Sequence, residues 1–213
     1  MAIKVLYEDK WLCICIKEPG ILSESGGMPE LLKEQCGMEH YCVHRLDRAV
    51  GGIMVYARDS KTAGKLSALV SGREFKKEYL AVVHGKPQDD SGILRDLLFK
   101  DSAKNKSYVV KRMRKGVKEA ELEYTVLESK AESSLVRIGL HTGRSHQIRV
   151  QFSSRAMPLL GDVKYGSTDK DCPLALWSAR LSFKHPVTGK TIDISENPPD
   201  IKPWTEFTGG QNG

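Results

Sequence analysis

The stretch HRLDRAVGGIMVYAR, residues 44–58, decides the fold. One carboxylate, Asp47, stands among three basic side chains, His44, Arg45 and Arg48, and a glycine pair leads directly into an apolar run. That run has the β-branched and aromatic residues of a buried strand. We therefore expect an acidic group in a loop at the start of a core strand, with glycines that let the backbone approach its neighbours closely.

Further strands and a few helices are expected on both sides of this stretch. A helix is predicted over SKTAGKLSALVSG, with Ser60 as its N-cap and Gly72 as its stop, and another begins near Ser145. The expected strands are two short ones around the polar turn at 8–10, and the runs at 52–58, 76–85, 121–129, 134–140, 174–183 and 191–194. Strands outnumber helices and several are neighbours in the chain. The pattern predicts an α+β fold with a mixed, mostly antiparallel central sheet and flanking helices.

Length and composition set the class of protein. The chain has 213 residues, 40% of them apolar, which suffices for one large domain or two small ones with a hydrophobic core. No apolar run reaches the roughly 18 residues that a membrane span needs. The first twenty residues do not have the charged start and small-residue cleavage site of a signal peptide, so we expect a cytoplasmic protein.

The five cysteines do not predict disulfides, because their number is odd and their spacings form no paired framework. Cys13 and Cys15 would share one face of a strand. Half of a zinc site is the alternative explanation, but no second Cys/His pair has a matching spacing. We expect two small buried side chains and no metal.

The positive charge is concentrated in one segment. The chain carries a net charge of +6, and residues 100–118 hold eight Lys or Arg and one acid, so the remaining residues sum to −1. Such a segment suits a nucleic-acid backbone, although a solvated loop with no partner has the same composition. Tyr108, Val109 and Val110 inside it favour a strand.

A second cluster of polar side chains lies in HTGRSHQIR, residues 141–149. A helix that opens near Ser145 would place Ser145 and Arg149 on one face, with His146 beside Arg149. His141 and His146 are wrongly spaced for a metal on one helical face, and no acidic third ligand is near. No nucleophile elbow, dinucleotide fingerprint or phosphate-binding loop is present, so no nucleotide cofactor is expected.

Taken in order, several motifs resemble those of the RluA-type RNA pseudouridine synthases. They are HRLDRAVGGIMVYAR, KKEYLAVVHG, HTGRSHQIRVQF followed by PLLGDVKYG, and LSFKHPVTGK, and the resemblance runs from about residue 5 to residue 204. It implies the pseudouridine synthase fold with a basic active-site cleft. It also implies a single catalytic domain over 1–213, with no separate N-terminal RNA-binding domain. The isomerisation involves no redox change and no external energy, so no cofactor is expected, and a monomer is the default expectation. The implied partner is ribosomal or transfer RNA, with ribosomal RNA favoured.

The resemblance also assigns roles to residues. Asp47 would be the catalytic carboxylate, acting by attack at C1′, by attack at C6 or by supporting elimination. Tyr79 would stack on the target base, Arg149 would pair with Asp47, and Arg45 would fill the gap left by the extruded base. Further expected RNA contacts are His44, Arg48, Arg144, His146, Lys111, Arg112, Arg114 and Lys115. Basic groups around the acid would keep it ionised in a dry pocket.

The sequence departs from the family pattern in three places. HRLDRAVGG replaces the frequent HRLDRDTSG, Gln151 stands where a histidine is common, and KEPG replaces KPxG. Two rival functions also stay open. One is an RNA-binding or chaperone module without turnover. The other is a nucleosidase that releases the base with a second carboxylate; the motifs supply none, although spacing alone does not exclude Asp59 and Asp162.

Overall fold

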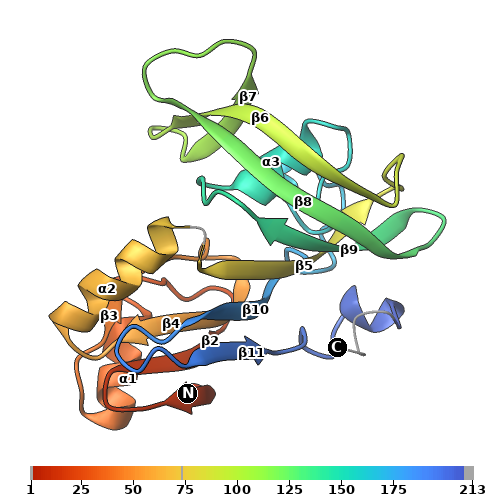
Figure 1. Cartoon of the computed structure of the whole chain (residues 1–213). Coiled ribbons are helices and arrows are strands. Elements are labelled where there is room, and N and C mark those ends of the chain that lie inside the picture. Colours follow the sequence, from red (N-terminus) through yellow and green to blue (C-terminus); the bar gives the residue numbers. More distant parts are fainter. Residues whose placement is uncertain (1, 73, 209–213) are drawn as a thin grey trace. The chain divides into compact units, whose positions relative to one another are not determined.

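The apolar runs of the sequence form the strands of an α+β protein in the computed structural model, which describes residues 2–72 and 74–208 (Figure 1). Within these ranges there are eleven strands, three α-helices and two 3₁₀ helices. The chain divides into two compact units. Unit 1 is Met1–Lys77 with Trp177–Glu196, and unit 2 is Glu78–Leu176 with Asn197–Gly213. The predicted α+β class with a mostly antiparallel sheet is confirmed.

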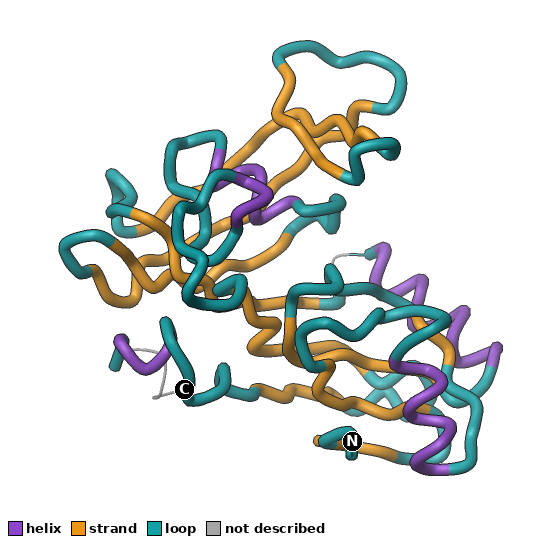
Figure 2. Tube along the Cα trace, turned by 180° about the vertical axis from the view of Figure 1, so that it is seen from behind, coloured by secondary structure: helices purple, strands orange, loops and turns teal. Residues whose placement is uncertain are grey.

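Unit 1 is built around two fully buried strands. In sheet order its strands are β1 (Val5–Glu8), β2 (Leu12–Lys17), β4 (Gly51–Ala57) and β10 (Leu176–Lys184), while β3 (Tyr41–Cys42) pairs with β4 and β11 (Thr191–Ser195) pairs with β10. Every residue of β2 and β4 is buried. All pairs are antiparallel except β10 with β4, which is parallel. The helices α1 (Met28–Cys36) and α2 (Ser60–Ser71) lie beside these strands (Figures 1 and 2).

Unit 2 is an antiparallel sheet with one helix against it. Its strands follow the order β5 (Lys76–His84), β9 (Ser133–Leu140), β8 (Val117–Ser129), β6 (Ser91–Asp101) and β7 (Lys106–Val110). The helix α3 (Gln147–Ser153) contacts β6, β7 and the 3₁₀ turn η1 (Val163–Tyr165), and a second such turn, η2 (Trp204–Glu206), follows later. Buried apolar residues pack together within the unit, among them the clusters Val82, Leu135, Ala175 and Phe207, and Leu98, Ala120, Val150 and Tyr165.

The predicted strands are confirmed, and both predicted helix starts are wrong by one or two residues. Asp59, not Ser60, caps α2, because its carboxylate accepts hydrogen bonds from Thr62 N at 2.8 Å and Thr62 Oγ1 at 2.7 Å. The helix α3 begins at Gln147, so Ser145 lies outside it. The sequence pattern missed α1, β3 and β6.

The glycine pair permits the close approach of two strands. Gly51 and Gly52 pair with Trp177 and Ser178 of β10. A Cβ on Gly51 would lie 2.5 Å from the Trp177 ring, and one on Gly52 would lie 2.5 Å from Ser178 N. Gly52 also has φ +122°, which side chains rarely adopt. The lack of side chains at Gly51 and Gly52 therefore allows β10 of the same unit to pack closely against β4.

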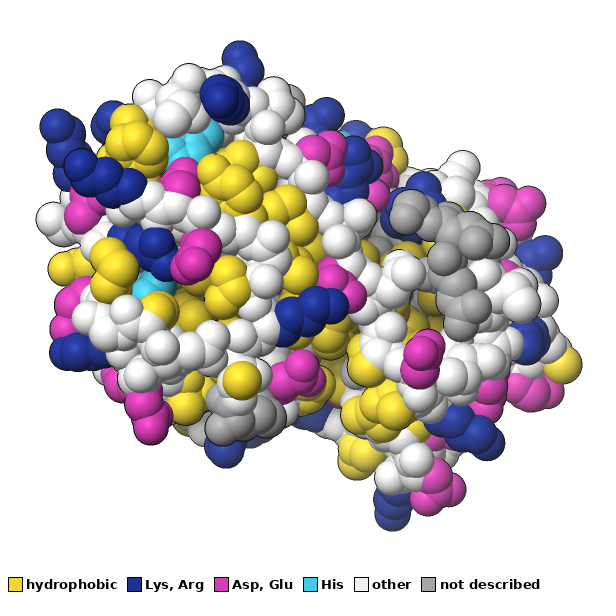
Figure 3. All heavy atoms as spheres, turned by 90° about the horizontal axis from the view of Figure 1, so that it is seen from below, with side chains coloured by type: hydrophobic (Ala, Val, Ile, Leu, Met, Phe, Trp, Pro, Cys, Tyr) yellow, Lys and Arg dark blue, Asp and Glu magenta, His cyan; other side chains and the backbone are white. Residues whose placement is uncertain are grey.

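Charges of both signs are mixed over the face shown in Figure 3, where basic and acidic side chains alternate without a large patch of either sign. Exposed cations gather instead in the loop between β7 and β8 (Figure 1), at Lys111, Arg112, Arg114 and Lys115. In the part of the chain that the structure describes, no helix is long and apolar enough to span a bilayer.

Replacing Gly52 by alanine should destabilise the protein strongly. The new methyl group would overlap the backbone of Ser178 at a strained φ, so Gly52→Ala is expected to lower the free energy of unfolding by about 2–4 kcal/mol in urea titrations. Gly64→Ala is the matched control. Gly64 lies inside α2 with open space where its Cβ would be, and alanine there should raise stability by up to about 1 kcal/mol. Equal effects of Gly52→Ala and Gly64→Ala on the free energy of unfolding would contradict the close packing of Gly52 against Ser178.

Candidate functional site

The loop that carries Asp47 is fastened to the segment that follows β2. Asp47 is half-buried, and its carbonyl accepts a hydrogen bond from Val50 N at 2.9 Å. Next to it, Leu46 N donates to Ser23 Oγ at 3.0 Å, and that hydroxyl donates to Leu46 O at 2.9 Å. The loop is thus held by backbone contacts on either side of the carboxylate, which fixes where Asp47 can point.

The buried side chain of Lys17 also holds the Asp47 loop in place. Its side chain is fully buried, and Nζ donates to the carbonyls of Glu18, Ile21 and Arg48 at 3.1, 3.0 and 3.3 Å. Burial lowers the pKa of Lys17 to about 8, while the negative charges of Asp47 and Glu18 act in the opposite direction. The ammonium therefore lies within electrostatic reach of Asp47. Lys17 is not among the residues predicted from the sequence; the available signal was a lysine that ends an otherwise apolar strand.

The two arginines around Asp47 are exposed, as expected for residues that meet a ligand. Arg48 Nε donates to Gly20 O at 2.8 Å, which further joins the loop to the turn after β2. Arg45 forms an exposed ion pair with Glu24 at 3.3 Å. Exposed pairs of this kind are weak, so the guanidinium of Arg45 can leave Glu24 for another anion.

His44 is buried, unlike its basic neighbours. Its Nε2 accepts a hydrogen bond from Val55 N at 3.2 Å, and its ring lies 5.5 Å from that of Phe75. Burial, together with the positive charge of Lys77, lowers the pKa of His44 to about 3. The ring is therefore neutral at physiological pH and contributes no positive charge to the environment of Asp47.

Arg149 is held by a buried carboxylate in unit 2. Nε and Nη2 each donate to an oxygen of Asp162 at 2.7 Å, and both side chains are almost completely buried. The guanidinium carbon lies 5.0 Å from the centre of the Tyr165 ring. Asp162 and Tyr165 belong to PLLGDVKYG, a motif to which the sequence analysis gave no residue roles. No spacing rule reveals that a helical arginine and a carboxylate thirteen positions later form a bidentate pair.

His146 joins the same group from the start of α3. The residue adopts a left-handed conformation with φ 52°, and its Nδ1 lies 2.8 Å from the Tyr165 hydroxyl. That hydroxyl also accepts a hydrogen bond from Ser107 N at 2.8 Å. His146, Arg149 and Tyr165 therefore form one connected cluster. The sequence placed His146 beside Arg149 on one helix, but His146 precedes α3, and the two residues are linked through Tyr165.

The other predicted residues occupy separate places. Tyr79 is a buried residue of β5, paired in register with Ile138 of β9. Arg144 is half-buried and donates to Glu119 O at 2.8 Å. The four cations of the β7–β8 loop are exposed, and Arg114 packs over Phe99 with 5.0 Å between guanidinium and ring centre. Asp47 lies in unit 1, whereas Tyr79 and Arg149 lie in unit 2.

The two cysteines of β2 are buried core side chains, as predicted. Cys13 and Cys15 are completely buried on β2. Hydrogen bonds with Cys15 and with His40 lower the pKa of Cys13 to about 6. Among residues 2–72 and 74–208, no three His, Cys, Asp or Glu side chains are grouped so that they could hold a metal ion.

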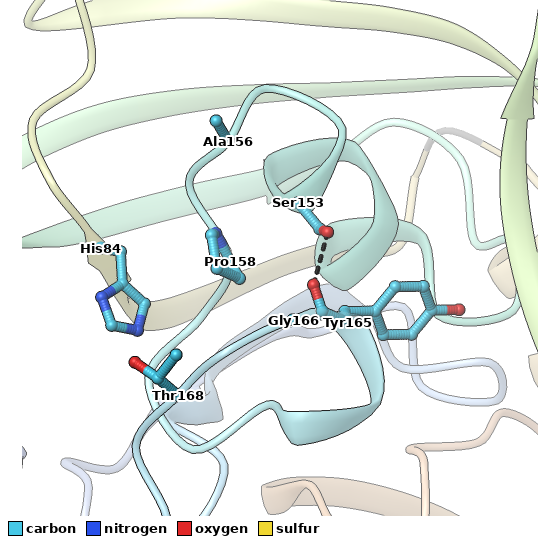
Figure 4. Close-up of a pocket in the computed structure, with 7 residues that line it drawn as sticks. All are labelled: His84, Ser153, Ala156, Pro158, Tyr165, Gly166 and Thr168. Carbon is cyan, nitrogen blue, oxygen red and sulfur yellow. Dashed lines mark hydrogen bonds between the residues drawn. The ribbon is translucent and has the colours of Figure 1, made fainter.

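A cavity of about 410 Å³ lies elsewhere in unit 2 (Figure 4). His84, Ser153 and Thr168 line it, and Ser153 Oγ donates to Tyr165 O at 2.6 Å. His84 Nε2 meets both Ser167 Oγ at 3.1 Å and an oxygen of Asp169 at 2.7 Å. Because one ring nitrogen contacts both partners, the trio does not have the arrangement of a hydrolase triad, in which Ser and Asp contact opposite nitrogens.

The buried pair in unit 2 should matter far more than an exposed pair of the same geometry. Asp162→Asn is expected to lower the free energy of unfolding by about 3–5 kcal/mol, because it leaves the Arg149 charge without its buried counter-ion. Asp193 makes a similar two-pronged contact with Arg180 on the surface, so Asp193→Asn should cost about 1 kcal/mol or less. Similar midpoints for both variants in urea unfolding would refute this difference.

Acid should destabilise the protein partly through His44. Its pKa is about 3 in the folded chain and 6.5 in the unfolded one, so between these values only the unfolded chain binds the proton. The stability that the neutral ring contributes is complete above pH 6.5 and is lost as pH falls toward 3. Relative to His44→Gln, the wild type should lose up to about 1.4 kcal/mol per pH unit between pH 6 and 4. Parallel stability curves for the two proteins would disprove the assignment.

Comparison with known proteins identifies the family. The family model described as "RNA pseudouridylate synthase" matches residues 14–154. The "Ribosomal large subunit pseudouridine synthase C" of Buchnera aphidicola subsp. Schizaphis graminum (strain Sg) is 31% identical over 206 residues, which cover 89% of this chain but only 65% of that protein. The "tRNA pseudouridine synthase C" of Pasteurella multocida (strain Pm70) is 29% identical over 91% of this chain and 90% of its own.

Solved structures agree with this result. The structure titled "Human RNA Pseudouridylate Synthase Domain Containing 4" matches with a TM-score of 0.78 and 25% identity, over 92% of this chain and 89% of that one. The residues that the family model matches include the Asp47 loop and end just after α3, so they contain Lys17, Asp47, His146 and Arg149. Asp162 and Tyr165 follow the matched region. The chain belongs to the RNA pseudouridylate synthase family.

Proposed function

We propose that this protein is an RNA pseudouridine synthase, which isomerises specific uridines of structured RNA to pseudouridine. Ribosomal RNA is the first candidate substrate and transfer RNA the second, in line with the names of the two relatives. The observation that carries the proposal is a half-buried carboxylate, Asp47, fixed by its own backbone and by Lys17 within the region that matches the family. Both units serve as a single catalytic domain, which acts as a monomer in the cytoplasm.

The reaction needs one well-placed acid and no redox partner. The bond between N1 of uracil and C1′ of the ribose breaks, the base turns, and a bond forms between C5 and C1′. The proton on C5 is lost and N1 gains one, so atoms and electrons balance within the uridine and no cofactor is consumed. Asp47 acts as the nucleophile or electrostatic group at the sugar or the base. Tyr79 stacks on the uracil, and Arg149 pairs with Asp47.

The basic residues hold the RNA while the base leaves its stack. Extruding a base costs a few kcal/mol, and less in a loop than in a helix. Arg45 is suited to fill the gap, because the ion pair that it forms with Glu24 is exposed and weak. The RNA backbone is contacted by His44, Arg48, Arg144 and His146, and by the exposed loop residues Lys111, Arg112, Arg114 and Lys115.

The environments of the two alternative carboxylates favour the isomerase over a nucleosidase. A nucleosidase of the glycosidase type requires a second carboxylate that is free to act on water or on the leaving group. Both carboxylate oxygens of Asp59 accept hydrogen bonds from Thr62 in the cap of α2. Both oxygens of Asp162 accept hydrogen bonds from Arg149. Neither candidate from the sequence is available for that role. The non-catalytic binding module has no such observation in its favour.

The test is turnover on RNA that carries tritium at C5 of uridine. Wild type should release tritium to water, and Asp47→Asn should reduce the rate by at least about 10³-fold, because the amide cannot replace the carboxylate in the reaction. Asp193→Asn, a surface change in the same unit, is the matched control and should keep wild-type activity.

The products separate the three functions. Tritium release with pseudouridine in the digested RNA supports the synthase. Free uracil would show a nucleosidase instead. RNA binding by the wild type, with neither product from ribosomal or transfer RNA transcripts, would leave the binding module as the function and reject the proposal.

A further inference from the structure

Lys77 is a half-buried cation that has no carboxylate partner among the residues that the structure describes. It lies in β5, and within the described residues it forms no ion pair and no hydrogen bond through its ammonium group. Lys17 provides an internal comparison, because it is fully buried but donates to three carbonyls and lies within electrostatic reach of Asp47. Burial lowers the pKa of both lysines to about 8, but for Lys77 no negative charge acts against that effect.

A second unsatisfied donor lies close to Lys77. Because Nε2 of His44 accepts the hydrogen bond from Val55 N, the neutral ring must carry its proton on Nδ1. In the described part of the chain Nδ1 is buried and has no hydrogen-bond partner. A buried N–H without an acceptor costs about 1–3 kcal/mol of stability, so such groups are uncommon unless something else satisfies them.

Phe75 brings the two donors into one cluster. The ammonium of Lys77 lies 5.4 Å from the centre of the Phe75 ring, and the His44 ring lies 5.5 Å from the same centre. Phe75 is itself stacked on Phe183, with 4.7 Å between ring centres. The charge of Lys77 also acts on His44 directly. The ammonium of Lys77 and the Nδ1–H of His44 therefore both lie beside the Phe75 ring, and among the described residues neither has a hydrogen-bond acceptor.

One anion would satisfy both groups. We propose that Lys77 and the Nδ1–H of His44 form a binding site for a single RNA phosphate beside the target uridine. This inference rests on the proposed function, since that function supplies the anion. Lys77 and Tyr79 are two positions apart on β5 and share one side of that strand, so the phosphate belongs to the nucleotide that Tyr79 receives or to its immediate neighbour. The contact positions the RNA and carries no information about base sequence.

The salt dependence of RNA binding tests this site. The probe is a fluorescein-labelled RNA hairpin with a uridine-rich loop, and affinity is measured by anisotropy between about 50 and 200 mM salt. Lys77→Met should weaken binding about 10-fold and reduce the slope of log K against log salt by about 0.7–0.9, the value for one phosphate contact. Lys77→Arg keeps the charge and should restore the slope.

Two further variants separate this site from general electrostatics. Lys76→Met removes an exposed neighbouring charge on the other side of β5 and should leave the slope unchanged. His44→Phe removes a neutral donor, so it should weaken binding without altering the slope. Thermal unfolding provides the structural readout: Lys77→Met should raise the melting temperature, because it removes a half-buried charge that has no counter-ion.

The outcomes are distinct. An unchanged slope for Lys77→Met, or a loss of slope equal to that of Lys76→Met, overturns the phosphate site. A lower melting temperature with wild-type affinity would show that Lys77 is structural. The proposed function can fail separately: if the wild type binds the hairpin but forms no pseudouridine, the slopes still decide the phosphate site. If the wild type does not bind the hairpin, the site is rejected.

Discussion

The contact between the Lys17 ammonium and three backbone carbonyls is the constraint on which the site of unit 1 depends. Removing an ammonium from water costs several kcal/mol, and three carbonyl acceptors with a nearby carboxylate offset that cost. One of these carbonyls belongs to Arg48, the residue directly after Asp47. The acid therefore sits on a backbone that is already fixed before any substrate arrives, as a preorganised site requires.

Unit 2 applies the same principle to a positive charge. Arg149 is presented from a short helix, but Asp162 fixes the plane of its guanidinium and Tyr165 covers it. Such a group loses little conformational entropy when it meets an anion, because its rotamer is set in advance. This arrangement requires a buried ion pair, and the loss of either Arg149 or Asp162 would strongly destabilise the protein. Each unit thus holds one charged side chain in a fixed environment: the carboxylate of Asp47 in unit 1 and the guanidinium of Arg149 in unit 2.

The sequence predicted what depends on local pattern and missed what depends on distant contacts. Alternating and continuous apolar runs located most strands, and the HRLD motif located Asp47. The strand β6 was missed because SGILRDLLFKD mixes charged and apolar residues without a clear period. The roles of Lys17 and Asp162 come from partners up to 31 positions away, and the burial of His44 comes from packing against Phe75. None of these partners can be read from spacing in a single sequence.

The path of the chain between the units has a consequence for synthesis on the ribosome. The strand β4 pairs at Gly51 and Gly52 with β10, which emerges roughly 120 residues later, about 6–24 s at usual elongation rates. During that interval the glycine end of a wholly apolar strand has no parallel neighbour, and an open strand edge invites pairing with other chains. Unit 1 therefore completes its sheet after most of unit 2 has been translated, and the nascent chain is most exposed to misassembly in that window.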